Sequence, residues 1–180
     1  MNGVVVWITG LPSSGKSRFA RHANTALQAR GTASCLLDGD EVRACLVPTP
    51  GYSPADRDAF YESLAKLAAL IARQGQIVLV PATAHRKVFR DRARALAPAF
   101  LEVWVATSLA ECEARDKKGL YALARAGKLQ GVPGLDEPFE EPIAPALIVQ
   151  RADDAAAVES LCAQVVRLAG DGTQDSRGAD

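Results

Sequence analysis

The sequence predicts an α/β fold in which a parallel sheet of about five strands carries helices on both faces. Short apolar runs rich in β-branched residues alternate along the chain with longer segments of helical periodicity. Strand–helix–strand units of this kind make right-handed crossovers, and their helices cover both faces of a parallel sheet. The 180 residues correspond to about one domain, and a hydrophobic content of 48% is sufficient for a packed core.

The first strand is expected at residues 4–9, where VVVWIT forms an apolar run that ends in a threonine. A continuous apolar run is typical of a strand that is buried on both faces. The remaining strands are expected at residues 34–37, 77–80, 100–105 and 146–149.

The helices follow from apolar spacing and from capping residues. Ser53 and Pro54 are a cap and a first-turn proline, and Glu111 stands three residues after Ser108, as in a capping box. We expect helices at residues 16–30, 53–73, 86–96, from 108 onward, and 153–168. Residues 170–180 (GDGTQDSRGAD) are small and polar and are expected to be a disordered tail, which leaves residues 1–169 as the domain.

Composition excludes several classes of function. Lys plus Arg and Asp plus Glu number 21 each, which argues against a broadly cationic nucleic-acid binder. Four well-separated cysteines and two histidines make a zinc site or a disulfide framework improbable and favour a reducing compartment. We find no leader pattern and no apolar run of about 18 residues, so we expect a cytoplasmic protein without membrane or nucleic-acid partners.

The strongest functional motif is GLPSSGKS at residues 10–17, which matches G-x-x-x-x-G-K-[ST] between a strand and a helix. Glycines let successive backbone N–H groups wrap a phosphate, and the helix N-terminus adds partial positive charge. Lys16 is expected to reach the β- and γ-phosphates, and the Ser17 hydroxyl to bind Mg²⁺. A chance glycine turn is the alternative, but the context favours a three-layer P-loop NTPase fold that binds ATP. The expected phosphate-binding residues are Gly10, Leu11, Pro12, Ser13, Ser14, Gly15, Lys16 and Ser17.

Two carboxylates follow the second predicted strand, in the segment LLDGDEVR at residues 36–43. Asp38 could serve a magnesium-bound water and an acceptor hydroxyl, with Asp40 beside it, and Arg43 could hold an anionic acceptor. The alternative is an aspartate-rich turn with a helix cap. The strand at 77–80 is followed by PATA instead of the usual magnesium-binding aspartate, which favours a small-molecule or nucleotide kinase over a motor ATPase or GTPase.

From about Val4 to Val149 the chain resembles the adenylylsulfate kinases. The resemblance implies transfer of the ATP γ-phosphate to the 3′-hydroxyl of adenosine 5′-phosphosulfate, with Mg²⁺, in sulfate activation, and often in a homodimer. The segments that carry it are WITGL (7–11) with the phosphate loop, LDGD (37–40), GYS (51–53), DR (56–57), CEARD (112–116), KGLY (118–121), ARAG (124–127), GLD (134–136) and PFEEP (138–142).

The family pattern also implies roles for individual residues. Asp38 aligns with the carboxylate near the acceptor hydroxyl and magnesium, and a glycine- and proline-rich lid is expected at about residues 117–142. Arg115 and Lys118 align with the nucleotide side and the lid. The residues expected on the acceptor side are Asp40, Arg43, Tyr52, Arg57, Lys87 and Val132.

The chain departs from the family pattern at several positions, and the ATP-side features are kept better than the acceptor-side ones. Glu41 and Phe60 replace asparagines, Ala84 replaces a serine, and Val132 replaces a phenylalanine that stacks on the acceptor adenine. These changes keep a second hypothesis open, in which the same fold acts on another nucleotide or small metabolite. A non-catalytic nucleotide-binding module is the third hypothesis, and the intact Lys16, Ser17 and Asp38 argue against it.

Overall fold

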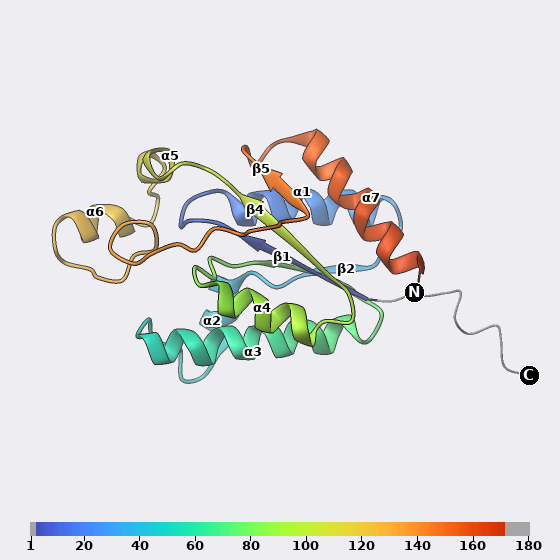
Figure 1. The fold of residues 1–180 in the computed structure, drawn as a ribbon, viewed down its shortest axis with the longest axis horizontal. Helices are drawn as coiled ribbons and strands as arrows, with labels where there is room; N and C mark the ends of the chain where they lie inside the picture. Colours follow the sequence, from blue (N-terminus) through green and yellow to red (C-terminus); the bar gives the residue numbers. More distant parts are fainter. Residues whose placement is uncertain (1–2, 172–180) are drawn as a thin grey trace, which may run out of the picture.

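The computed structural model describes residues 3–171 and confirms the three-layer α/β fold. Its strands are β1 (Val4–Thr9), β2 (Ser34–Leu36), β3 (Ile77–Pro81), β4 (Phe100–Val105) and β5 (Leu147–Val149). All pairings are parallel and the strand order is β2-β3-β1-β4-β5. The carboxyl ends of all five strands therefore lie at one edge of the sheet, on the left in Figure 1.

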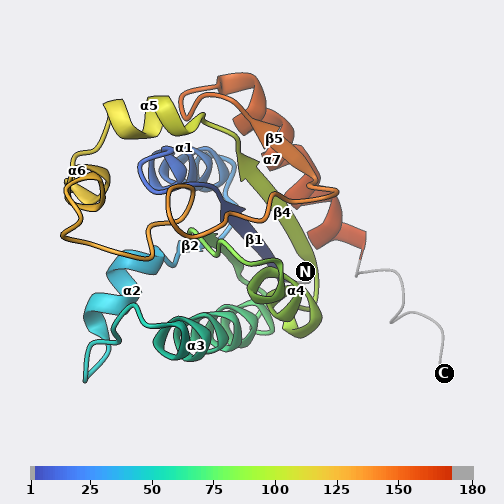
Figure 2. The ribbon, with the colours of Figure 1, turned by 60° about the vertical axis from the view of Figure 1, so that its left-hand side comes forward.

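Helices cover the sheet on both sides. They are α1 (Lys16–Ala29), α2 (Gly39–Cys45), α3 (Pro54–Ala72), α4 (Lys87–Leu96), α5 (Leu109–Ala114), α6 (Leu120–Arg125) and α7 (Ala155–Asp171). Figure 1 shows α1 and α7 on one face and α3 and α4 on the other. Figure 2 shows α5, α6 and the segment that follows them beyond the carboxyl edge of the sheet.

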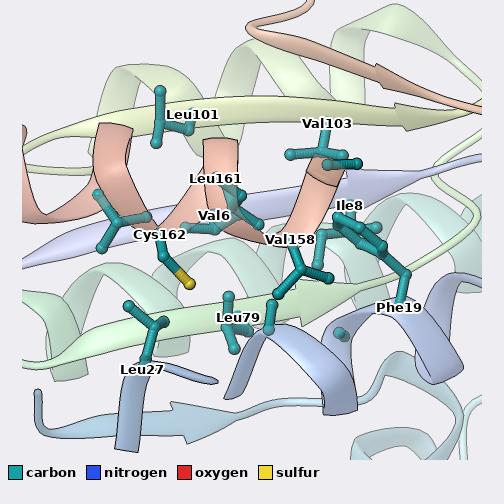
Figure 3. Packing of buried hydrophobic residues seen from close by; sticks show 14 of the residues in the cluster. Val6, Ile8, Phe19, Leu27, Leu79, Leu101, Val103, Val158, Leu161 and Cys162 are labelled. Carbon is teal, nitrogen blue, oxygen red and sulfur yellow. The ribbon is translucent and has the colours of Figure 1, made fainter. Parts of the chain in front are cut away.

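The alternating side chains of β1 divide the core into two clusters. Val6 and Ile8 pack toward α1 and α7, where they meet Phe19 and Leu161 (Figure 3). Trp7 lies in the opposite cluster, with side chains of α3 and α4. Because a strand with helices on both faces buries every side chain, β1 is buried throughout and is apolar up to its last residue, Thr9, as the sequence pattern predicts.

The predicted strands and long helices are confirmed to within three residues at their ends, and both expected caps are present. Ser53 caps α3, and Ser108 forms the capping box with Glu111 at α5. The last helix starts two residues later than expected and continues to Asp171, so it includes the first two residues of the predicted tail. The prediction of disorder for residues 172–180 lies outside the described residues.

Two short helices, α2 and α6, were not predicted. Each has seven residues or fewer, which is too short for apolar periodicity to be visible. Both helices begin at a glycine, a residue of low helix propensity. Gly39 is the first residue of α2, and Gly119 immediately precedes α6. Their stability therefore comes from tertiary contacts.

The described residues show neither a disulfide nor a metal-binding cluster. The four cysteines are free thiols. Among residues 3–171, no group of three or more His, Cys, Asp and Glu side chains is arranged to hold a metal ion. Over the same range, no helix combines the length and the apolar character of a membrane span.

A buried hydrogen bond fixes the loop between β3 and α4. Ala84 has a φ of 38°, which is unusual for a residue with a side chain. Its N–H donates to the hydroxyl oxygen of Tyr61 at 2.9 Å. Tyr61 comes from α3 and stacks on Phe89 of α4, with ring centroids 4.6 Å apart. The hydroxyl thus supports a strained backbone at the carboxyl edge of the sheet.

Replacing Tyr61 with Phe should lower the free energy of unfolding by about 1–3 kcal/mol, because the buried Ala84 N–H loses its acceptor. Urea unfolding followed by circular dichroism measures the effect. Tyr52→Phe is the matched control. Because Tyr52 is 63% exposed, removing its hydroxyl group should change the free energy of unfolding by less than about 0.5 kcal/mol. Equal losses in the two variants would contradict the role of the hydroxyl.

Candidate active site

A cavity of about 820 Å³ opens at the carboxyl edge of the sheet. Its lining comes from the loops after β1, β2, β3 and β5, from α3, and from residues 111–133. This is the position at which ligands bind in open parallel α/β sheets. The cavity therefore collects side chains that are far apart in the sequence.

Positive charge is concentrated in this cavity. Eight lysine or arginine residues line it, against four aspartate or glutamate residues, whereas the whole chain carries 21 of each class. Cationic walls around a cleft raise the local concentration of anions and stabilise bound phosphates. The cationic residues are Lys16, Arg18, Arg43, Arg57, Arg115, Lys117, Lys118 and Arg151.

The loop between β1 and α1 has room only for glycine at two positions. Gly10 has a φ of 153°, and a Cβ there would stand 2.6 Å from the carbonyl oxygen of Val105. Gly15 has a φ of 100°, and a Cβ there would stand 2.8 Å from Cβ of Ala152. Gly15 also precedes the first residue of α1, so the free N–H groups of the helix face the phosphate loop. The predicted phosphate loop is confirmed in conformation.

Lys16 is buried in the cavity wall, and its Nζ donates to the carbonyl oxygen of Leu11 at 2.7 Å. Burial lowers the pKa of this ammonium to about 8, while the carboxylates of Asp40 and Asp38 oppose the shift. The low pKa means that burial makes the charged form of Lys16 unfavourable. A bound polyanion would offset this cost by attracting the ammonium group.

Asp38 caps a helix and also lines the cavity. Its Oδ1 accepts from the backbone N–H of Asp40 at 3.0 Å, so the side chain caps α2 as an aspartate-rich turn does. The residue is buried and also lines the cavity together with Lys16 and Ser17. The cap fixes the carboxylate at the strand end without removing it from the site.

Arg43 of α2 also lines the cavity. Its Nη1 donates to the carbonyl oxygens of Pro50 and Gly51 at 3.1 and 2.6 Å. Its Cζ lies 3.8 Å from the ring centroid of Phe60 and 4.5 Å from that of Tyr52. The guanidinium is buried and has aromatic rings on its surface, a favourable arrangement for a partly desolvated cation.

The segment 117–142 lies against the cavity and is tied to the domain by polar contacts from several elements. Lys118 Nζ pairs with Asp40 at 2.5 Å, and Tyr121 donates to the carbonyl oxygen of Pro12 at 3.0 Å. Arg57 donates from Nη2 to the carbonyl oxygen of Gly131 at 2.5 Å. These contacts close the segment over the cavity.

Part of this segment has its own internal structure. The carboxylate of Asp136 accepts from the backbone N–H groups of Gly131 and Val132 at 2.7 and 2.6 Å. These hydrogen bonds lower the pKa of Asp136. The carbonyl oxygen of Val132 accepts from three following backbone N–H groups, with N–O distances of 3.0 to 3.3 Å. Residues 131–137 are therefore a hydrogen-bonded turn.

Most of the predicted site residues meet in the cavity. Those that line it are Pro12, Ser13, Gly15, Lys16, Ser17, Asp38, Asp40, Arg43, Tyr52, Arg57, Arg115, Lys118 and Val132. Gly10, Leu11 and Ser14 belong to the phosphate loop but do not line this cavity; Gly10 and Ser14 are buried, and Leu11 lines a neighbouring cavity.

Of the predicted acceptor-side residues, only Lys87 lies outside the cavity lining. Its Nζ pairs with Asp91 one helical turn away in α4. Val132 reaches the cavity, but it is almost completely buried in a small cluster with Cys112 and Tyr121, so it offers little surface to a base. The sequence motifs do not determine where these two side chains point, because that depends on how the folded chain packs.

Sequence reasoning missed several lining residues, among them Arg151, Asp153 and His85. Arg151 and Asp153 lie in the loop after β5, and the rule that parallel strands end at one edge could have found them. His85 lies in the loop after β3, one residue beyond Ala84, and the same rule could have found it.

His85 links the β3–α4 loop to the 117–142 segment. Its Nε2 lies 3.2 Å from Oε1 of Glu137, and its carbonyl oxygen accepts from the N–H of Glu140 at 2.8 Å. The side chain is 2% exposed. Burial lowers the pKa of His85, the nearby Arg57 lowers it further, and Glu137 acts in the opposite direction.

The free energy of unfolding should therefore fall as the pH drops below about 6.5, by at most about 1.4 kcal/mol per pH unit. In that range the unfolded chain binds a proton at His85 that the folded chain resists, so acid favours unfolding. Urea unfolding at pH 7.5, 6.5 and 5.5 measures the slope, which His85→Gln should reduce. His22→Gln, at the exposed second histidine, is the control and should leave the slope unchanged. A slope that survives His85→Gln would contradict this assignment.

Comparison with known proteins agrees with the geometry. The sequence profile of the adenylylsulphate kinase family matches residues 2–150. An adenylyl-sulfate kinase from Geotalea uraniireducens is 41% identical over 167 residues, covering 92% of this chain and 79% of the relative. A probable bifunctional SAT/APS kinase 2 from Sorangium cellulosum is 38% identical, and the match covers 99% of this chain but 31% of that protein.

Solved structures that superpose on this chain include APS kinases. The Mycobacterium tuberculosis APS kinase CysC in complex with AMPPNP and APS superposes with a TM-score of 0.81 at 37% identity, covering 93% of this chain and 97% of that one. A hexameric APS kinase from Thiobacillus denitrificans superposes with a TM-score of 0.63 at 26% identity, over 95% of this chain and 29% of that one. With its phosphate loop, its cationic cavity and these relatives, the chain belongs to the adenylylsulphate kinase family.

Proposed function

We propose that this protein transfers the γ-phosphate of ATP to the 3′-hydroxyl of adenosine 5′-phosphosulfate, a step of sulfate activation. The observation that carries the proposal is a single cavity in which Lys16 and Asp38 face the same space as Arg43 and Arg57. The similar M. tuberculosis kinase was solved with an ATP analogue and APS together, which supports two nucleotides in one site. Transfer to a different nucleotide or metabolite is the alternative, because the acceptor end carries Phe60 and Val132.

The phosphate-loop end fits ATP and Mg²⁺. The residues proposed for the triphosphate are those of the phosphate loop with Arg115 and Lys118, all on elements that meet at the carboxyl edge. Ser17 and Asp38 supply a hydroxyl and a carboxylate, the oxygen donors that Mg²⁺ accepts beside phosphate oxygens and water. When bound, Mg²⁺ would neutralise charge on the phosphates.

The protein's own contribution to the transfer is positioning and charge. Lys16 offers its ammonium to the phosphates, and Asp38, fixed as the cap of α2, offers a carboxylate to the acceptor hydroxyl. The 117–142 segment acts as a lid that keeps water from the γ-phosphate. Ala84, which aligns with a serine of the family pattern, is buried and has no hydroxyl, so transfer proceeds directly from donor to acceptor.

The cell compartment and the oligomeric state are also proposed. Four free thiols suit a reducing cytoplasm. Homodimerisation is proposed from the family resemblance, and a hexameric structural relative supports self-association. Sedimentation of the purified chain would measure its oligomeric state.

ADP release from Mg-ATP should increase at least tenfold when adenosine 5′-phosphosulfate is added, and mass spectrometry should find its 3′-phosphorylated product. Adenosine 5′-monophosphate, gluconate and uridine 5′-monophosphate serve as competing acceptors in the same assay. Stimulation by one of these alone would favour the alternative. No stimulation by any acceptor would favour a binding module. Asp38→Asn is the site control and should cut turnover far more than ATP affinity.

ATP affinity should weaken as the pH rises above about 8. A bound polyphosphate favours the charged form of Lys16 and raises its pKa above the value of about 8 in the free protein. Binding at pH 8.5–9.5 should therefore take up nearly one proton, which isothermal titration calorimetry in buffers of different ionisation enthalpy measures. Lys16→Ala should abolish this uptake. Uptake that persists in the variant would assign the proton to another group.

A further inference from the structure

We propose that Phe60 is a positioning residue that orients the Arg43 guanidinium toward the anionic group of the acceptor. This inference rests on the proposed function, because it concerns the acceptor end of the same cavity. It assigns to Phe60 a role that acts through Arg43 and does not require contact between Phe60 and substrate.

The guanidinium of Arg43 is held on two sides. The Phe60 ring centroid lies 3.8 Å from Cζ, which is the shortest of the described distances between an arginine Cζ and an aromatic ring. One nitrogen, Nη1, donates to the carbonyl oxygens of Pro50 and Gly51. A planar cation with a face against a ring and one nitrogen bound to carbonyls has little rotational freedom left.

The Phe60 ring is itself fixed. Phe60 is 3% exposed, and its ring meets the edge of Tyr61 at 5.4 Å with an interplanar angle of 62°. Tyr61 in turn is anchored by its hydroxyl to the backbone of Ala84. The orientation of Arg43 therefore depends on direct contact with the Phe60 ring, which is buried in the domain core.

Both Arg43 and Phe60 line the cavity, and Arg43 is 6% exposed. A guanidinium that is ordered before the ligand arrives loses less conformational entropy on binding an anion, so it binds more tightly. An asparagine at position 60 could not cover the face of a cation in this way. Phe60 thus holds the Arg43 charge in place, although its own side chain forms no hydrogen bond.

Steady-state kinetics with both substrates tests the proposal. Phe60→Leu keeps an apolar side chain but removes the ring; it should raise the KM for adenosine 5′-phosphosulfate by about tenfold. The KM for ATP and the kcat should change much less. Phe60→Tyr restores a ring and should restore the low KM. Phe89→Leu is the matched control, since Phe89 belongs to the same buried cluster but does not line the cavity.

A double-mutant cycle shows whether the effect passes through Arg43. In an Arg43→Lys background, which lacks the planar guanidinium, Phe60→Leu should have little further effect on the acceptor KM. Additive effects of the two substitutions would overturn the proposal. Parallel increases in both KM values, or an equal effect of Phe89→Leu, would also overturn it.

Nuclear magnetic resonance separates failure of this inference from failure of the proposed function. In the ligand-free protein, the heteronuclear NOE of the Arg43 Nε–Hε group should report a rigid side chain, and Phe60→Leu should make it mobile while Phe89→Leu does not. An inactive wild-type protein with a rigid Arg43 would reject the proposed acceptor and keep the positioning role. A rigid Arg43 in Phe60→Leu would reject the positioning role whatever the acceptor is.

Discussion

The parallel direction of all five strands is the constraint on which the rest of the molecule depends. Each strand returns through a crossover, so every loop that follows a strand emerges at the same edge of the sheet. Residues separated by more than a hundred positions, such as Lys16 and Arg151, line one cavity for this reason. Val6 and Ile8 pack into the core on one face of the sheet, and Trp7 packs into the core on the other face. This packing on both faces holds β1 in the middle of the sheet, and the phosphate loop starts where β1 ends.

Local signals predicted most of the fold and the nucleotide end of the site. Gly10 and Gly15 are required by backbone conformation and close contacts, and such requirements are readable from a motif. Asp38 was predicted both as a cap and as a site residue; it caps α2 and lines the cavity. The helices α2 and α6 could not be predicted, because short helices depend on contacts with the rest of the domain.

The positions of Lys87 and Val132 relative to the cavity could not be predicted, because side-chain direction depends on packing. Lys87 stands on α4 with a carboxylate one turn away, and that pair directs it away from the cavity. Val132 is buried with Cys112 and Tyr121, so a larger side chain at this position would have to displace that cluster. Sequence motifs give the positions of such residues along the chain, but they do not show whether the side chains point into the cavity.

The turn at residues 131–137 is held by two separate sets of contacts. The Asp136 carboxylate and the Val132 carbonyl oxygen hold it together from within, through hydrogen bonds to its own backbone. Arg57 and His85 attach it to the domain from outside, and the Val132 side chain packs with Cys112 and Tyr121. Substitutions at Arg57 or His85 would therefore weaken the attachment of the turn to the domain without removing the hydrogen bonds inside it.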